Sequence, residues 1–250
     1  MNMDYTKLPV TIIRGSGRVT VPGLGEVKAS GRAEIGPERV HTGGSCVLPG
    51  GIRVRDLDSS GSLTIEGDAE AETMTLSGSA SVRGSVKFTQ LSKSGSLRVE
   101  GDAEGETMEV SGSTTVEGRV KVRDLYSSGS ISVEKGIESS GHVKVKGCMR
   151  ADSVKAERFE LIMSNAVSRI RGGVEADYIR VEPKGWGDEG ELITDWVKGG
   201  EVHMENVECD TVSGDNVYIG DGCRVNGKVT YAHEIRVSPN AFMREQPQKV

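Results

Sequence analysis

The chain has 250 residues, of which 31 are Lys or Arg and 37 are Asp or Glu, giving a formal net charge of −6 at pH 7. Nucleic acids and anionic membrane surfaces recruit positively charged proteins, so this balance argues against a nucleic-acid partner and weakly against a membrane-surface protein. Aromatic residues make up only 4% of the chain, which is few for the core of a compact globule. No apolar run approaches the roughly 20 residues that span a bilayer, and the first residues lack a signal-peptide pattern, so we expect a cytoplasmic protein.

A repeat dominates the sequence after an N-terminal segment over residues 1–15. Ser-Gly dipeptides recur along the chain, and Gly43-Gly44 fills one missing position. The dipeptides begin at Ser16, Ser30, Ser60, Ser77, Ser94, Ser111, Ser128 and Ser140. From Gly44 to Gly129 the glycine recurs in equal steps, at Gly61, Gly78, Gly95 and Gly112 in between, a regularity that composition alone does not produce.

Apolar residues stand at fixed positions behind these glycines. Residues two and four positions after each glycine are mostly aliphatic, and such alternation is typical of a strand with one buried face. The second of these columns is predicted to form one inner stack of the core: Leu48, Ile65, Val82, Val99, Val116, Val133 and Val145. Two more apolar columns begin at Ile52 and Val54, and another begins at Leu57. Each repeat therefore reads as three short strands separated by turns.

A unit of this size cannot bury its own apolar face unless it stacks in register on its neighbours. We therefore predict an all-β fold, a right-handed parallel β-helix (β-solenoid) with three short strands per coil of about 17 residues. The regular β-helix is expected over residues 16–150. The left-handed alternative requires an inward residue at every sixth position, and the sequence lacks that pattern.

A second period of two coils overlies the first. The segment EGDAEAETM at residues 66–74 returns as EGDAEGETM at 100–108. Outward positions alternate in charge in the column Arg53, Glu70, Lys87, Glu104 and Lys121. Stacked neighbours lie about 4.8 Å apart, so a slip by one coil would bring like charges together. We expect the two-coil period to fix the register of the stack.

The segments SGSLTIEGDAEAETMTLSGSASVRGSVKF and SGSLRVEGDAEGETMEVSGSTTVEGRVKV resemble the bactofilins, the polymer-forming cytoskeletal proteins. The resemblance covers about residues 16–150 well and the rest of the chain loosely. It implies a right-handed three-sided β-helix that assembles end to end into filaments without a nucleotide. It also implies a scaffold for cell-shape or envelope enzymes at the membrane.

The regular rhythm loosens after residue 150, and residues 151–242 are expected to continue as an irregular β-helix. The segment 183–200 (PKGWGDEGELITDWVKGG) breaks the alternation and is predicted to project as a loop. It contains Trp186 and Trp196, which are candidates for a partner-binding site because Trp is frequent at interface hot spots. The alternative is that both rings fold back over the sheet. The polar tail over 243–250 is expected to be mobile.

The sequence offers little chemistry for catalysis. The four His are dispersed, and neither a Cys-x-x-Cys motif nor a phosphate-binding loop occurs. Cys46, Cys209 and Cys223 follow the alternating apolar pattern, which favours buried thiols over reactive ones. We expect no enzyme activity, no cofactor and no metal site.

The ends of the predicted solenoid suggest its function. A terminal coil presents unpaired backbone groups and an uncovered core, which a protein either caps or uses for assembly. Candidate contacts are Val19 and Val21 at one end, and Ile235, Val237 and Phe242 at the other. The leading hypothesis is a structural protein that polymerises with itself and scaffolds envelope or cytoskeletal partners. The alternatives are a non-polymerising adaptor that uses the 183–200 loop and an envelope-polysaccharide enzyme.

Overall fold

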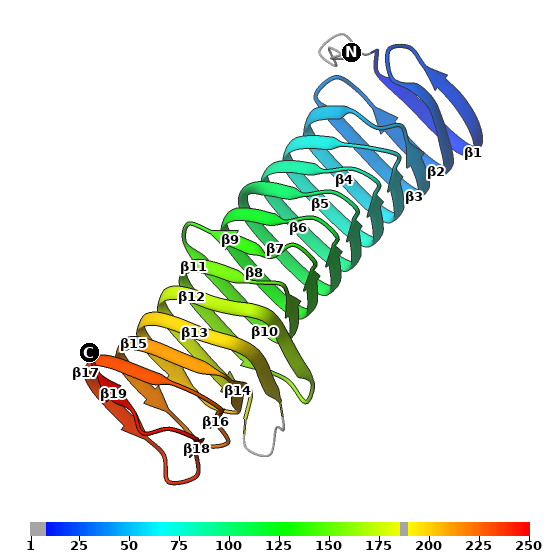
Figure 1. The fold of residues 1–250 in the computed structure, drawn as a ribbon. Coiled ribbons are helices and arrows are strands. Elements are labelled where there is room, and N and C mark those ends of the chain that lie inside the picture. The colour runs from blue at the N-terminus through cyan, green and yellow to red at the C-terminus, as the bar shows by residue number, and fades with distance from the viewer. Residues whose placement is uncertain (1–8, 186–189) are drawn as a thin grey trace. The chain divides into compact units, whose positions relative to one another are not determined.

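The structure is a computed structural model of the chain and describes residues 9–185 and 190–250. All regular elements in these residues are strands. The chain divides into two compact units, Met1–Val122 and Arg123–Val250. Within each unit, most successive turns of the backbone stack as parallel coils (Figure 1). This arrangement confirms the predicted β-solenoid class.

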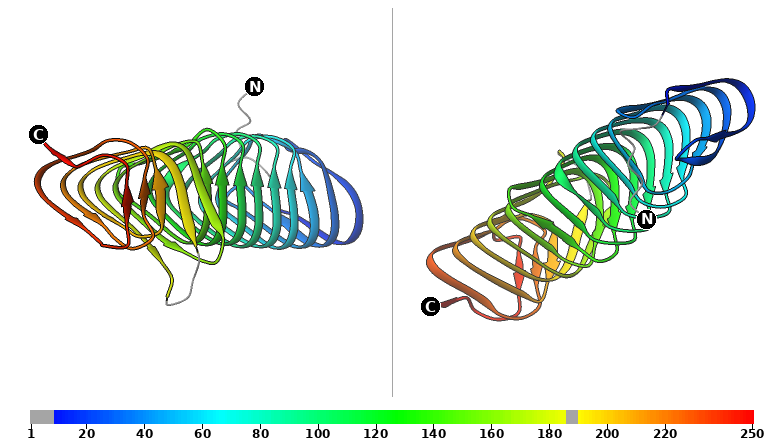
Figure 2. Two further views of the ribbon diagram at one scale, coloured as in Figure 1. Left: turned by 60° about the horizontal axis from the view of Figure 1, so that its bottom comes forward. Right: turned by 90° about the horizontal axis from the view of Figure 1, so that it is seen from above.

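The N-terminal unit contains strands β1 to β7 and the first residues of β8. Their bounds are Thr11–Val21 (β1), Gly25–Ile35 (β2), Arg39–Leu48 (β3), Ile52–Ile65 (β4), Ala69–Val82 (β5), Val86–Val99 (β6), Ala103–Val116 (β7) and Val120–Val133 (β8). From β3 to β7 each strand pairs in parallel with the next in one constant register, which places each corner glycine against that of the next coil. Figure 2 shows these coils lying one behind another with their turns aligned.

Each regular coil is one long strand that bends at its corners and points three pairs of side chains inward. In β4 the inward residues are Ile52 and Val54, Leu57 and Ser59, and Leu63 and Ile65. The Ser-Gly dipeptide forms a corner between the last two pairs. At Gly78 in the next coil φ is +89°, and an added Cβ would lie 2.3 Å from the carbonyl oxygen of Gly61. Only glycine fits this corner, which explains the regular recurrence of the dipeptide.

The predicted inner stack forms in the N-terminal unit. Its members there are register partners from coil to coil and are all buried: Leu48, Ile65, Val82, Val99 and Val116. In the C-terminal unit the prediction is wrong at Val145, because Val133 pairs with Ala151 and Val145 lies in a different buried column. The corner glycine of this coil is Gly147, with φ of +140°, which pairs with Gly129. This coil is therefore one residue longer than the regular ones. The dipeptide Ser140-Gly141, which the sequence suggested as its corner, does not form it.

The first two strand pairs differ from the prediction, because β1–β2 and β2–β3 are antiparallel. The predicted coil places Val19 beneath Ala33, but Val19 pairs with Val27 across a hairpin. The glycines Gly17, Gly31 and Gly44 are also spaced more closely than those of the regular coils. A reversal of direction needs only a short turn, here at residues 22–24, whereas a parallel neighbour needs a complete coil.

The two-coil period has a structural basis in the turns. Asp68 Oδ1 accepts a hydrogen bond from the Ser85 amide at 2.8 Å, and Ser85 Oγ accepts one from the Asp102 amide at 3.1 Å. Asp102 Oδ1 in turn accepts from the Arg119 amide at 2.8 Å. Asp and Ser therefore alternate as acceptors for the next coil, which reproduces the recurrence of the EGDAE segment.

Outward ion pairs follow the predicted charge alternation. Arg53 Nη2 lies 2.6 Å from Glu70 Oε2, and Lys87 Nζ lies 3.2 Å from Glu104 Oε2. All four side chains are well exposed, so each pair contributes little stability. Their value lies in the register, because a shift of one coil would replace attraction with repulsion.

One inner column was missed in the sequence because it mixes polar and apolar residues. Its members are Thr42, Ser59, Leu76, Lys93 and Val110. Lys93 is only 3% exposed, and its Nζ donates to the carbonyl oxygens of Gly78, at 2.7 Å, and Ser94. Burial lowers the pKa of Lys93 below its ordinary value of 10.5, because the ammonium loses hydration.

Another inner column alternates in size as the sequence suggested. Phe88 lies between Ala71 and Gly105 in the stacked register. A Cβ added to Gly105 would lie 2.3 Å from the Phe88 ring. The absence of a side chain at Gly105 therefore provides room for the one aromatic ring in this column.

In its described residues, the C-terminal unit completes β8 and contains eleven further strands. Their bounds are Ile137–Ser139 (β9), His142–Ala151 (β10), Val154–Met163 (β11), Val167–Pro183 (β12), Glu191–Met204 (β13), Val207–Cys209 (β14), Thr211–Ile219 (β15), Arg224–Val225 (β16), Val229–Val237 (β17), Phe242–Met243 (β18) and Gln248–Lys249 (β19). One outward column runs through His142, Arg158, Tyr178, Glu201, Asn216 and Glu234. Its members are unevenly spaced along the chain, so the coils of this unit vary in length.

Two predicted boundaries are wrong in this unit. Most of the expected 183–200 loop is strand, because β13 begins at Glu191 and pairs with β12 and β15. The expected mobile tail over 243–250 contains β19, which pairs with β17. Both segments were predicted as irregular because they are rich in polar residues. A strand with one solvent-facing side also carries polar residues on that side, so polar composition does not exclude a strand.

We expect Gly105→Ala to destabilise the protein by about 1–3 kcal/mol, as overpacking does, because the new methyl group meets the Phe88 ring. The substitution should cost less in a Phe88→Ala background, where the ring is absent and only the contact with the carbonyl oxygen of residue 88, at 2.4 Å from the added Cβ, remains. Urea unfolding of the four proteins in this double-mutant cycle measures the coupling. An equal cost in both backgrounds would show that Phe88 is not the cause.

Lys93→Met should raise the free energy of unfolding at pH 7 by about 1 kcal/mol, because it removes a buried ammonium that donates to two neutral carbonyl oxygens. Between the lowered pKa and 10.5 the unfolded chain binds more protons at this site, so the stability of the native protein with Lys93 rises with pH. The advantage of the variant should therefore shrink as pH approaches 10.5. Urea unfolding from pH 7 to 10.5 tests this, with the exposed Lys87→Met as a control that should show no such trend.

Candidate assembly surfaces

Strand β1 forms the free edge of the N-terminal unit. It pairs with β2 on one side, and no strand among the described residues lies on its other side (Figure 1). Of the two predicted contact residues, Val21 is buried and Val19 is half-buried. The more exposed apolar residues are Val10, at 64%, and Ile12, at 51%. Sequence reasoning missed Ile12 because its assumed first coil began after it.

The last coil of the C-terminal unit leaves its apolar side chains partly uncovered. Ile235 is half-buried although its register partner Val217 is buried, and Val237 is 37% exposed. Phe242 in β18 is 51% exposed, and the Arg224 guanidinium carbon lies 5.2 Å from the centre of its ring. The three residues predicted for this end therefore do lie on the final coil, with Phe242 the most accessible.

Of the two tryptophans predicted as partner contacts, the structure describes Trp196. Trp196 lies in β13, where its ring covers Gly173 of β12, and a Cβ at Gly173 would meet that ring at 2.2 Å. Its side chain is 36% exposed, which agrees with the alternative that the ring folds back over the sheet. Trp186 lies outside the described residues.

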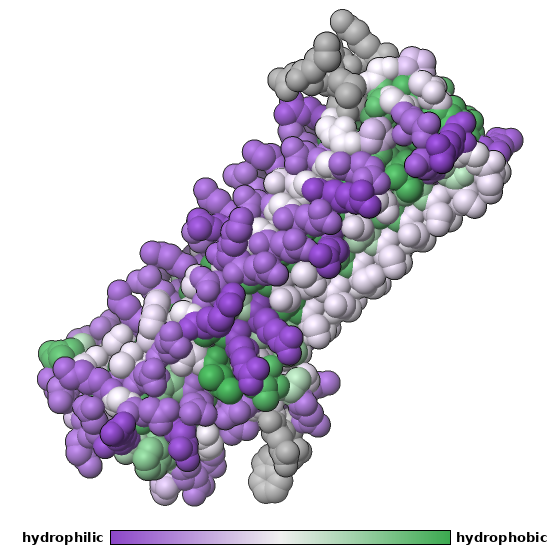
Figure 3. Space-filling view, turned by 45° about the vertical axis from the view of Figure 1, so that its right-hand side comes forward, coloured by the Kyte–Doolittle hydropathy of each residue, from purple (hydrophilic) through white to green (hydrophobic). Residues whose placement is uncertain are grey.

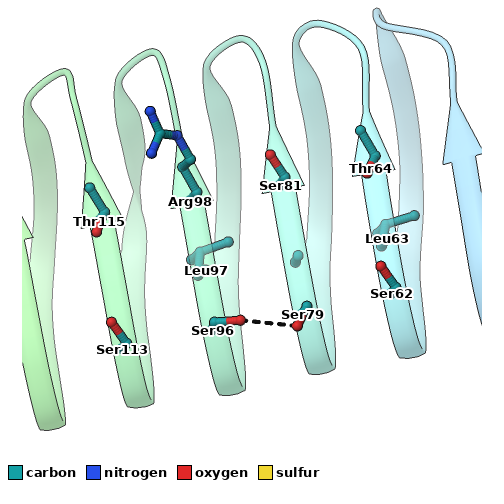
Figure 4. A pocket seen from close by; sticks show the side chains of 11 residues that line it. Ser62, Leu63, Thr64, Ser79, Ser81, Ser96, Leu97, Arg98, Ser113 and Thr115 are labelled. Carbon is teal, nitrogen blue, oxygen red and sulfur yellow. Dashed lines mark hydrogen bonds between the residues drawn. The ribbon is translucent and has the colours of Figure 1, made fainter.

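One face of the N-terminal unit is lined by small hydroxyl side chains. Ser62, Ser79, Ser96 and Ser113 stack in one outward column, and Ser96 Oγ donates to Ser79 Oγ at 3.1 Å (Figure 4). They border a shallow hollow of about 320 Å³. In the space-filling view pale side chains run beside the purple charged ones over this unit (Figure 3). Arg98 is the one ionisable residue among those that line the hollow, so none of them could act as a general base on a serine hydroxyl.

The thiols lie where the alternating pattern predicted. Cys46, Cys209 and Cys223 are buried, whereas Cys148 is half-buried. Burial raises the pKa of Cys46 and Cys223 to about 11 and that of Cys209 to about 12. These three thiols are therefore held in the unreactive protonated form near neutral pH.

The described part of the chain contains no group of three or more His, Cys, Asp or Glu side chains placed to hold a metal ion. Among its elements, no helix has the length and apolar character for crossing a membrane.

No family model matches the chain, and no solved structure matches it. The chain is 34% identical over 58 residues to the Bacillus subtilis protein described as "Uncharacterized protein YhbF". This match covers 23% of the chain and about a quarter of that relative's own length.

We expect iodoacetamide to modify Cys148 first in the native full chain. Cys46, Cys209 and Cys223 should react only after urea unfolding, because burial both raises the pKa of their thiols and blocks access. Mass spectrometry of timed samples identifies the modified residue. Modification of Cys209 as fast as Cys148 in the native protein would contradict this burial.

Proposed function

We propose that the protein is a structural, non-catalytic cytoplasmic protein that self-assembles end to end through its β-solenoid coils. Its filaments need no nucleotide, and they scaffold envelope or cytoskeletal proteins, in association with a membrane where those partners reside. The observation that carries the proposal is the outer edge of β1, which no strand of the described residues covers, together with exposed Ile12. The bactofilin resemblance of residues 16–150 supports the same function.

The edge of β1 lacks common protections against pairing. Natural sheets blunt their edges with proline, bulges, very short edge strands or charged side chains, and of these β1 has only the charged side chains of Arg14 and Arg18. Strand β1 has 11 residues, contains no proline, and pairs with β2 without a register shift. An incoming strand would gain main-chain hydrogen bonds and cover Ile12, so this edge favours addition of another chain.

The last coil is a second candidate contact surface, because it also exposes apolar side chains to solvent. Phe242 and Val237 expose apolar area, and Ile235 belongs to a core column that no later coil closes within the described residues. Complete burial of one large apolar side chain contributes about 1.5–3 kcal/mol. A second copy that covered this coil would extend the inner columns, which supports assembly through coil ends over assembly through the charged faces.

The adaptor alternative has less support. It relied on a loop over 183–200 with two tryptophans, and Trp196 lies in a strand against Gly173. The connection between β12 and β13 is limited to residues 184–190. We therefore favour self-assembly as the proposed function.

Negative-stain electron microscopy of the purified full chain, without nucleotide, tests the proposal. We expect filaments, and we expect Ile12→Arg and Phe242→Arg to reduce them to short oligomers or monomers by placing a charge on each coil end. The matched control is Tyr126→Arg, which alters an exposed aromatic residue of β8 away from both surfaces. Circular dichroism should confirm that all three variants keep their strands.

Two results would overturn the proposal. Monodisperse wild-type particles at every protein and salt concentration would exclude self-assembly. Equal loss of filaments in Tyr126→Arg and in the two end variants would show that assembly does not depend on the coil ends.

A further inference from the structure

A shallow groove crosses β13, β15 and β17 on the outer surface of the C-terminal unit. These strands are successive neighbours in the stack (Figure 1). The groove encloses about 550 Å³ and is lined by Glu201, His203, Asn216, Val217, Tyr218, Glu234 and Arg236. None of these residues belongs to the proposed coil-end contacts, so end-to-end assembly does not explain the groove.

The two sides of the groove differ in chemistry. One outward column supplies Glu201, Asn216 and Glu234, which are rich in hydrogen-bond acceptors. The adjacent outward column supplies His203, Tyr218 and Arg236, which carry flat π surfaces. A ligand along the groove would therefore meet polar acceptors on one side and flat rings on the other.

The flat side makes further ring contacts with Tyr178, which lies one coil earlier in the column of Glu201. The Arg158 guanidinium carbon lies 3.9 Å from the centre of the Tyr178 ring. The ring centres of Tyr178 and His203 are 6.1 Å apart, and those of His203 and Tyr218 are 5.9 Å apart. These contacts hold the rings at successive coils in a fixed row, which presents Tyr218 to a ligand with little loss of side-chain freedom.

Charge in the groove is largely compensated within each coil. Glu201 Oε1 lies 2.8 Å from His203 Nε2, and Arg236 Nε lies 2.7 Å from Glu234 Oε1. The groove holds two carboxylates, one guanidinium and one imidazole, so it carries no excess of positive charge. A polyanion such as a nucleic acid or an acidic lipid surface would therefore find no electrostatic attraction there.

We propose that this groove binds an uncharged oligosaccharide that runs along the stack. A pyranose ring has an apolar face that packs on Tyr218 and equatorial hydroxyls that donate to Glu201, Asn216 and Glu234. Coils repeat about every 4.8 Å, close to the advance per sugar of an extended glycan, so each coil would meet one sugar. The guanidinium of Arg236 would donate to a ring or hydroxyl oxygen at the end of the groove.

Isothermal titration calorimetry of the full chain tests this with neutral hexasaccharides of β-1,4-linked glucose, β-1,4-linked N-acetylglucosamine and α-1,4-linked glucose. At least one of them should bind. Tyr218→Ala should weaken that binding at least about tenfold, whereas Tyr218→Phe should retain most of it because the ring remains. Tyr126→Ala is the matched control, since it removes an exposed tyrosine from the same outward column outside the groove and should leave affinity unchanged.

Competing ligand classes provide the opposing outcomes. Three probes represent these classes. Hexagalacturonate represents acidic glycans, oligolysine represents basic peptides, and phosphatidylglycerol vesicles represent membranes. Tighter binding of any of these than of every neutral hexasaccharide would overturn the proposal, as would no binding of the neutral sugars at all. Equal weakening by Tyr218→Ala and Tyr126→Ala would overturn the placement in this groove.

Discussion

Backbone pairing between successive coils is the interaction on which the structure depends. In the regular part of the N-terminal unit each residue lies against the equivalent residues of the coils before and after it, so its environment is set by its column. A column at a corner accepts only glycine, as at Gly78, and a core column must share its volume among neighbours, as Phe88 and Gly105 do. The hydrogen bonds from Ser85 to Asp68 and from Asp102 to Ser85 tie turns to the same register.

The regular coils could be predicted from the sequence because a column repeats one physical demand. Leu63, Ala80 and Leu97 are register partners, as their spacing suggested. The antiparallel start could not be predicted in this way, because a hairpin and a parallel coil show the same apolar alternation on a strand. Lys93 was missed for a different reason, since its long side chain reaches two carbonyl oxygens and can occupy an inward position that periodicity assigns to apolar residues.

The terminal coils differ from the inner ones in their pairing. An inner coil forms backbone hydrogen bonds with a neighbour on each side, whereas a terminal coil forms them on one side. Strand β1 runs antiparallel to β2, so this unit does not begin with a parallel coil. The outer edge of β1 still has no partner strand among the described residues. The final coil keeps Phe242 exposed beside Arg224. The sequence pattern indicated Phe242 and not Ile12, because it included Phe242 in the last coil, although that coil continues to β19, and began the first coil too late in the chain.

Regularity also limits what the surface can do. In the regular coils the column Ser62, Ser79 and Ser96 repeats one kind of side chain, and a repeated hydroxyl offers no contrast of charge or shape. In the C-terminal unit two neighbouring columns differ, so that Asn216 and Tyr218 of one strand face the same groove with unlike chemistry. The irregular coils are therefore the part of this solenoid in which recognition of a specific ligand is most readily built, while the regular coils serve the spacing and register of the stack.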